Sequence, residues 1–158
     1  ASDGGVFTYG DARFVGSAGN VRLAKPVVGM AATPDGGGYW LVASDGGVFT
    51  YGDAGFFGSA GNVRLNAPVT GMASTGGGGY WLVAADGGVF TFGDARFDGS
   101  AANARLARPV GGMAATPDRQ GYWLLGSDGG VFTYGDAPYD GSLAGQPVEP
   151  ITAITAEP

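Results

Sequence analysis

The side chains in this chain best suited to recognising a ligand are an asparagine and an arginine that recur two residues apart. Asn amides and Arg guanidinium groups form directional hydrogen bonds with hydroxyl and carboxylate groups. Three equivalent copies would suit a ligand that itself repeats. The predicted binding residues are Asn20 and Arg22, Asn62 and Arg64, and Asn103 and Arg105. The alternative is that each Asn supports a turn and each Arg is solvated.

Aspartates recur twice in each repeat. A pair of carboxylates can hydrolyse glycosidic bonds, and carboxylates are also calcium ligands. A catalytic pair is needed only once, however, and Asp is common in turns because its side chain accepts hydrogen bonds from nearby backbone N–H groups. We therefore predict turn roles and no metal site, with calcium binding at the Gly-Asp-Ala turns as a minor alternative. The residues are Asp3, Asp11, Asp45, Asp53, Asp86, Asp94, Asp128 and Asp136.

Histidine and cysteine are both absent from the sequence. Their absence excludes Ser-His-Asp and Cys-His catalysis and the usual zinc sites. We expect a protein that is not an enzyme and that needs no cofactor.

Three Tyr-Trp pairs carry rings that could stack on sugars. They are Tyr39-Trp40, Tyr80-Trp81 and Tyr122-Trp123. Neighbouring residues of a strand point to opposite faces of a sheet, so both rings of a pair would be buried where sheets pack on both faces. We expect these pairs to belong to the core.

A long recurring phrase must position all of these residues. It reads Ser-Asp-Gly-Gly-Val-Phe-Thr-Tyr-Gly-Asp-Ala from Ser2, and close copies begin at Ser44, Ala85 and Ser127. Successive copies are 42, 41 and 42 residues apart. A period of this length indicates a repeat architecture.

One repeat contains four short apolar segments separated by turns. In the repeat that begins at Pro26 these segments are 27–33, 39–43, 48–51 and 56–57. Asp-Gly between two apolar runs is the strongest short hairpin signal, and no helical periodicity free of Gly and Pro competes with it. Each repeat is therefore predicted to form four antiparallel strands.

Four strands in about 42 residues are typical of a β-propeller blade. We predict an all-β fold in one domain, a β-propeller of about four four-stranded blades that is closed by the two termini around a central channel. A β-trefoil is the alternative. The units are residues 1–25, 26–67, 68–108 and 109–146, followed by a terminal strand over 147–158 that pairs with the blade begun by residues 5–16.

The two end segments together lack a Tyr-Trp-Leu strand. The missing strand is either absent from the shared blade or supplied by a longer parent chain or another copy. The sequence also starts without Met and shows no signal peptide, so we expect a mature product or a piece of a longer protein.

Composition excludes two kinds of partner. Eight Lys and Arg against 14 Asp and Glu give a net charge of −6, so no basic surface for nucleic acid is expected. No apolar run approaches the ~18 residues of a membrane-spanning helix, so we expect no membrane insertion. The 33 glycines occupy fixed places between apolar runs, which predicts tight turns rather than disorder.

The phrases Gly-Tyr-Trp-Leu and Asp-Gly-Gly-Val-Phe within Gly29–Ala54 resemble repeats of large secreted proteins of actinobacteria. Such repeats often accompany cell-wall hydrolase, esterase or peptidase domains, and the strand order is similar to that of NHL propellers. The resemblance covers nearly the whole chain. It implies an extracellular or cell-envelope location, and it implies no catalytic residues.

Two functions are compatible with these features. The first is a non-catalytic extracellular binding module for cell-envelope glycan or another polymer. The alternative is a structural or assembly scaffold that oligomerises or spaces the domains of a larger secreted protein. An exposed Trp beside an Asn-Arg loop would favour the first function, and an unpaired strand edge in a terminal unit would favour the second.

Overall fold

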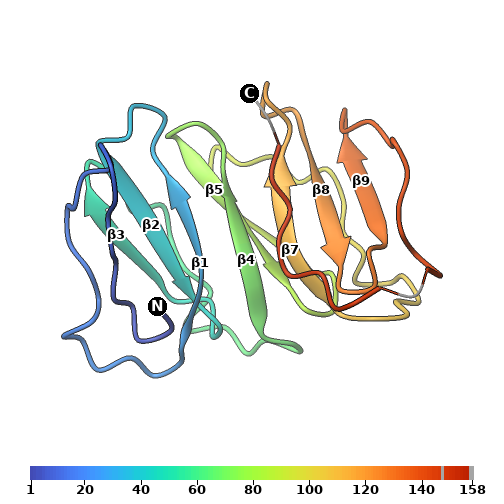
Figure 1. The fold of residues 1–158 in the computed structure, drawn as a ribbon, viewed down its shortest axis with the longest axis horizontal. Coiled ribbons are helices and arrows are strands. Elements are labelled where there is room, and N and C mark those ends of the chain that lie inside the picture. Colours follow the sequence, from blue (N-terminus) through green and yellow to red (C-terminus); the bar gives the residue numbers. More distant parts are fainter. Residues whose placement is uncertain (147, 157–158) are drawn as a thin grey trace.

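The computed structural model describes residues 1–146 and 148–156, which contain nine strands and no helix. The strands form three antiparallel sheets of three strands each (Figure 1). The first sheet contains β1 (Val27–Ala32), β2 (Gly38–Ala43) and β3 (Val48–Gly52); the second contains β4 (Val69–Ser74), β5 (Gly79–Ala84) and β6 (Val89–Gly93); the third contains β7 (Val110–Ala115), β8 (Gly121–Gly126) and β9 (Val131–Gly135).

The Asp-Gly-Gly turns form as the sequence predicts. Between β2 and β3, the Gly47 N–H donates a hydrogen bond of 3.0 Å to Oδ1 of Asp45, and Gly46 has a φ of 83°. Few residues other than glycine adopt a positive φ without strain. The first Asp of each of the other three phrases accepts the same bond from the glycine two residues later, at Asp3, Asp86 and Asp128.

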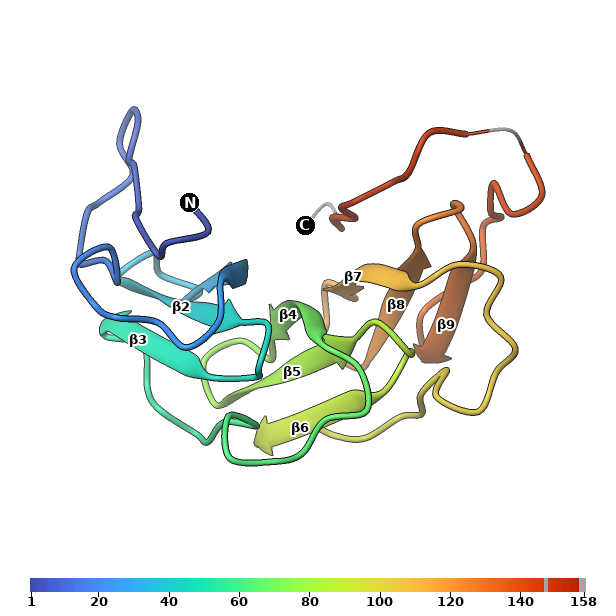
Figure 2. The same cartoon turned by 90° about the horizontal axis from the view of Figure 1, so that it is seen from below.

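The three sheets lie side by side in an open arc (Figure 2). The strands β1, β4 and β7 follow its inner side, while β3, β6 and β9 follow its outer side. Glycines let the inner strands come close, since a Cβ built on Gly29 would lie 3.3 Å from the Cα of Gly71. The small residues of the first strand of each repeat therefore serve close packing between sheets.

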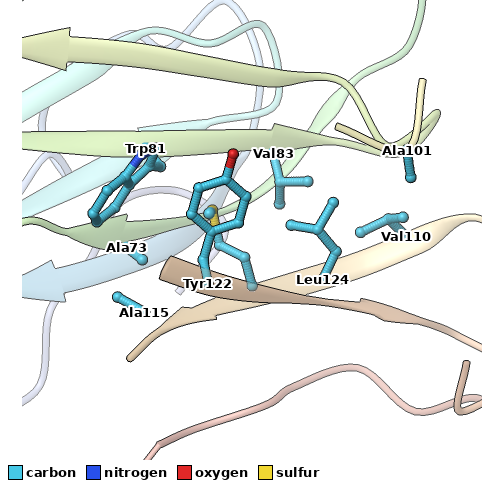
Figure 3. Close-up of a cluster of buried hydrophobic side chains, with 9 residues drawn as sticks. Ala73, Trp81, Val83, Ala101, Val110, Ala115, Tyr122 and Leu124 are labelled. Carbon is cyan, nitrogen blue, oxygen red and sulfur yellow. The ribbon is translucent and has the colours of Figure 1, made fainter. Parts of the chain in front are cut away.

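The hydrophobic core lies between neighbouring sheets. Trp40 and Val42 of the first sheet pack in one cluster with Met72, Tyr80 and Leu82 of the second. The corresponding residues of the second and third sheets form an equivalent cluster (Figure 3). Trp40 and Trp81 are 0% and 1% exposed and their Tyr neighbours are also buried, so the predicted core role is confirmed for the first two pairs. In the third pair Tyr122 is buried but Trp123 is only half-buried.

The predicted fourth strand of each blade does not form. After β3, the Ala54 N–H bonds back to the Tyr51 carbonyl, which turns the chain away from the sheet. The backbone that follows is bonded by side chains, including the Trp40 indole at Gly55 and the Tyr80 hydroxyl at Gly58, and not by a strand ladder. Four four-stranded blades were therefore a wrong prediction, and the sheets have three strands each.

The predicted closure by the termini is also wrong, because none of the described strands closes the arc into a ring. The Ile151 N–H donates to the Ser127 carbonyl. Residues 148–156 run from the third-sheet end along the inner side of the arc, while residues 5–16 lie at the first-sheet end (Figure 2). Each end segment lacks the middle strand that would complete a sheet, so four copies of the phrase yield three sheets. An open arc of three sheets is not a β-trefoil either. Pro147 and residues 157–158 of the predicted terminal strand lie outside the described residues.

Candidate functional site

One exposed aromatic residue recurs two positions after the end of each copy of the Ser-Asp-Gly-Gly-Val-Phe-Thr-Tyr-Gly-Asp-Ala phrase. We call these four residues the outer aromatic row: they are Phe14, Phe56, Phe97 and Tyr139, whose side chains are 58%, 62%, 61% and 62% exposed. Their separations of 42, 41 and 42 residues match the repeat. Each unit thus presents one large apolar ring to solvent at an equivalent position.

Two side chains from the core hold the backbone on either side of each ring. Around Phe56, the Trp40 indole N–H donates a hydrogen bond of 2.7 Å to the Gly55 carbonyl. On the other side, the Tyr80 hydroxyl donates a bond of 2.5 Å to the Gly58 carbonyl. Trp40 belongs to the first sheet and Tyr80 to the second, so the segment that carries Phe56 is tied to both sheets.

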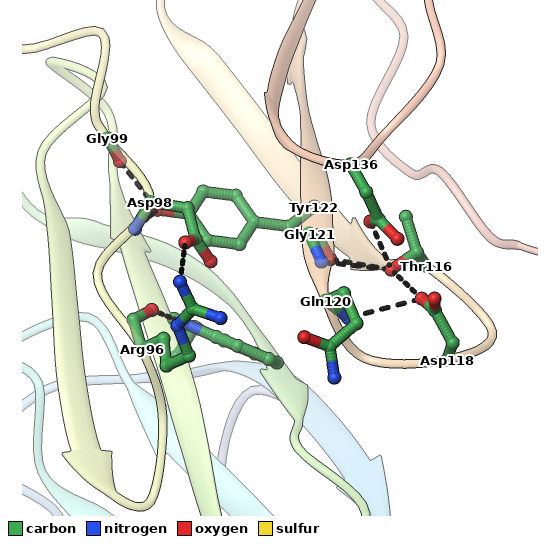
Figure 4. A network of polar contacts seen from close by, with 10 residues as sticks. Arg96, Asp98, Gly99, Thr116, Asp118, Gln120, Gly121, Tyr122 and Asp136 are labelled. Carbon is green, nitrogen blue, oxygen red and sulfur yellow. Dashed lines mark hydrogen bonds and ion pairs between the residues drawn. The ribbon is translucent and has the colours of Figure 1, made fainter.

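The same arrangement surrounds Phe97. The Trp81 indole donates a bond of 2.7 Å to the Arg96 carbonyl. The Tyr122 hydroxyl donates a bond of 2.6 Å to the Gly99 carbonyl and accepts one of 3.3 Å from the Asp98 N–H (Figure 4).

The end units keep one half of this arrangement each. The Trp123 indole bonds to the carbonyl of Pro138, next to Tyr139, and the Tyr39 hydroxyl bonds to the carbonyl of Gly16, close to Phe14. The buried Tyr-Trp pairs therefore support the outer aromatic row indirectly, because their hydrogen bonds fix the backbone that carries its rings. An aromatic ring held in this way offers a flat apolar face to a ligand without further ordering of the chain.

The charges beside the row differ from unit to unit. Arg96 precedes Phe97 and lies 3.7 Å from Oδ1 of Asp98. The Arg96 side chain is 73% exposed, so the pair adds little stability. The Asp98 Oδ2 atom is buried and has no hydrogen-bond partner within residues 1–146 and 148–156. The equivalent residue of the preceding unit is Phe57, which instead packs edge-on against Tyr80 with ring centroids 5.8 Å apart.

The six predicted binding residues all lie exposed, in three separate loops. Each Asn is in a tight turn whose closing bond runs, for example, from the Val63 N–H to the Ala60 carbonyl at 2.9 Å. The three loops lie in successive units, so the motifs are not brought together into one cluster. Whether they bind a ligand stays a prediction for Asn20, Arg22, Asn62, Arg64, Asn103 and Arg105.

Two Asp pairs come together at the turns that flank the middle strands, although their members lie 18 residues apart in the sequence. In the third sheet, the Thr116 hydroxyl lies 2.8 Å from Oδ1 of Asp118 and 3.2 Å from Oδ1 of Asp136 (Figure 4). Hydrogen bonds from Thr116 and the Gln120 N–H lower the pKa of Asp118, whereas desolvation and the nearby Asp118 raise the pKa of Asp136.

An equivalent pair, Asp35 and Asp53, surrounds Thr33 in the first sheet. The carboxylates of both pairs accept hydrogen bonds from Thr hydroxyls and backbone N–H groups of the turns in which they lie. The described part of the chain brings no three acidic, His or Cys side chains together as a metal site.

The row was missed because its residues were assigned to a fourth strand. A signal was present: the position is aromatic in all four copies, while the residue before it is Arg, Gly, Arg or Pro. An aromatic residue retained where its neighbours vary indicates a role that the turn itself does not require.

Comparisons with known proteins add no assignment. No protein-family model matches the chain, and no curated protein matches it significantly. Within the described residues there is no helix with the length and apolar character to cross a membrane.

Proposed function

We propose that this chain is a non-catalytic binding module for an extended polymer, such as a cell-envelope glycan, outside the cell. The outer aromatic row is the contact surface. The single observation that carries the proposal is one exposed aromatic ring at the same position in each unit. The extracellular location follows the resemblance of the Gly-Tyr-Trp-Leu and Asp-Gly-Gly-Val-Phe phrases to secreted repeats.

The row suits a ligand that repeats. Neighbouring sheets pack on the order of 10 Å apart, so the rings are spread along the arc and can contact successive parts of one polymer. Each contact is weak alone, but linked contacts raise the overall affinity because the second is intramolecular. Because hydrogen bonds already fix the backbone beside each ring, less conformational entropy is lost when the ring contacts the polymer.

Polar contacts would come from the Asn-x-Arg motifs. In the first three units the motif follows the exposed ring along the chain, as Asn62 and Arg64 follow Phe56. Asn and Arg side chains can bond hydroxyl and carboxylate groups of a glycan. A non-catalytic role is supported by the absence of His and Cys and by the use of both Asp pairs in turns.

Binding to insoluble cell-envelope polysaccharide and to its soluble fragments would test this proposal. We expect Phe56→Ala and Phe97→Ala each to weaken retention, and the double variant to weaken it by more than either one. Phe7→Ala, which removes an exposed ring outside both the row and the Asn-x-Arg motifs, is the matched control and should bind the polymer normally. Unchanged retention by a folded double variant would refute the row as the contact surface.

A second candidate function is assembly, and one observation favours it. The Trp rings of the first two sheets are buried, so the exposed Trp expected of a sugar site is not found there. A partly uncovered apolar face is found instead at the first sheet, where Met30 is 51% exposed. A scaffold that joins copies or spaces the domains of a larger protein is therefore our alternative proposal.

A further inference from the structure

The second and third sheets each have one face that is covered by the preceding sheet. On the second sheet this face presents Met72, Tyr80 and Leu82, which are 6%, 0% and 0% exposed. Trp40 and Val42 of β2 belong to the cluster that covers it. The middle strand of one sheet thus supplies the residues that bury the next sheet.

The same face of the first sheet is covered only in part. Its residues are Met30, Tyr39 and Leu41, in the positions of Met72, Tyr80 and Leu82. The N-terminal segment covers Tyr39 and Leu41 with Val6, Val15, Ala18 and Leu23. Met30 remains 51% exposed, against 6% for Met72, because no preceding strand supplies a Trp and a Val.

The N-terminal segment also has the sequence of a paired strand without its partner. Residues 6–10 read Val-Phe-Thr-Tyr-Gly, identical to β3. The strand β3 pairs with β2 along its whole length, whereas 6–10 belongs to none of the described sheets. Phe7 and Tyr9 are 74% and 84% exposed, while their β3 counterparts are half-buried.

An apolar groove of about 620 Å³ lies between this segment and the first sheet. Its lining includes Val6, Thr8, Val28, Met30, Tyr39 and Leu41. The groove is thus bounded by the two elements that a middle strand contacts in the complete units, namely a Val-Phe-Thr-Tyr-Gly segment and the face of the following sheet.

We propose that this groove is the docking site for one extended strand of the sequence Gly-Tyr-Trp-Leu-Val-Ala, supplied by a second molecule from a repeat whose middle strand is not already paired within a sheet of its own. Binding would add the strand to the edge of residues 6–10, a known mode of peptide recognition. The Trp and Val side chains would cover Met30, Tyr39 and Leu41 in the way that Trp40 and Val42 cover the second sheet. None of the rings of the outer aromatic row lines this groove, and the docking does not depend on polymer binding.

The pairing of β2 with β3 defines the expected register. Trp40 lies opposite Thr50, and Val42 lies opposite Val48. The docked strand should therefore run antiparallel to residues 6–10, with its Trp opposite Thr8 and its Val opposite Val6. A slip by one residue would turn the Trp and Val away from the groove.

The test is binding of a soluble peptide with the sequence of residues 37–44 to the whole chain, measured by calorimetry and by amide hydrogen exchange. We expect saturable binding and new protection of the amides of residues 6–10. Met30→Asp in the whole chain should weaken binding at least about tenfold, by placing a charge in the groove. Val63→Asp, at an exposed loop position, should bind the peptide normally.

A second peptide tests the register. Replacing its Trp40 and Val42 by Ser should abolish binding. The proposal is overturned if the unchanged peptide does not bind, if Met30→Asp has no effect, or if the protected amides lie elsewhere. Self-association of the whole chain that leaves 6–10 unprotected would also overturn it. The Phe56→Ala and Phe97→Ala double variant should bind the peptide normally, so failures of polymer binding and of strand docking are distinguishable.

Discussion

The hydroxyl of Tyr122 donates a hydrogen bond of 2.6 Å to the carbonyl of Gly99, which joins the third sheet to the segment that leaves the second. Tyr122 is fully buried, so its ring packs between sheets while its hydroxyl fixes the backbone next to Phe97. One residue thereby connects the core to the surface that we propose for binding.

Removing the Tyr122 hydroxyl should free the backbone at Gly99, while the buried ring continues to fill its place in the core. We expect Tyr122→Phe to lower the free energy of unfolding by about 0.5–1.5 kcal/mol, since the Gly99 carbonyl loses its partner. Urea denaturation measures the change. Tyr139→Phe removes an exposed hydroxyl and should leave stability unchanged. Equal stability of the Tyr122 variant and the parent would mean that the hydrogen bond contributes nothing.

Stability should fall at alkaline pH because Tyr122 resists ionisation in the folded state. Burial, with Asp98 nearby, raises its pKa to about 12, whereas an unfolded Tyr titrates near 10. Below about pH 10 both states keep the proton, and the contribution is fully present. Between about pH 10 and 12 only the folded state keeps it, so stability decreases as pH rises.

Unfolding in urea at several pH values across this window measures the effect. Tyr122→Phe should reduce the slope without removing it, because burial also raises the pKa of Tyr80. A slope that the substitution leaves unchanged would contradict the assignment to Tyr122.

Asp98 is a position where the chain's own repeat suggests a more stable residue. Its Oδ2 atom is buried without a partner among the described residues, whereas Phe57 at the equivalent position packs on Tyr80. We expect Asp98→Phe to raise the free energy of unfolding by about 1–3 kcal/mol, as the desolvation penalty of the carboxylate is removed. Thermal unfolding measures this, and a lower midpoint would show that Asp98 is stabilised in a way the contacts do not reveal.

Trp81 should contribute more to stability than Trp123, although both form the same indole hydrogen bond. Trp81 is 1% exposed between two sheets, while Trp123 is half-buried in the last sheet. Trp81→Ala should cost about 3–5 kcal/mol, as for truncation of a buried aromatic residue. Trp123→Ala should cost less in the same denaturation experiment. A loss below about 1 kcal/mol for Trp81→Ala would contradict its place in the core.

The local pattern of residues was enough to predict three of the strands in each complete repeat and the turns that join them. The Asp-Gly-Gly phrase forms its turn in every unit, and the Tyr-Trp-Leu segment forms the buried middle strand of each sheet, because these preferences act between residues close in the chain.

The number of strands per sheet, the open arc and the exposed row depended on contacts between distant residues. Phe56 and Phe57 are adjacent and identical, yet Phe56 is 62% exposed while Phe57 packs against Tyr80 of the next sheet. Closure likewise depends on whether a partner strand is present at each end, which the spacing of repeats does not reveal. Whether a side chain is buried or exposed is decided by the neighbouring sheet that packs against it. Only the tertiary structure shows where that sheet lies.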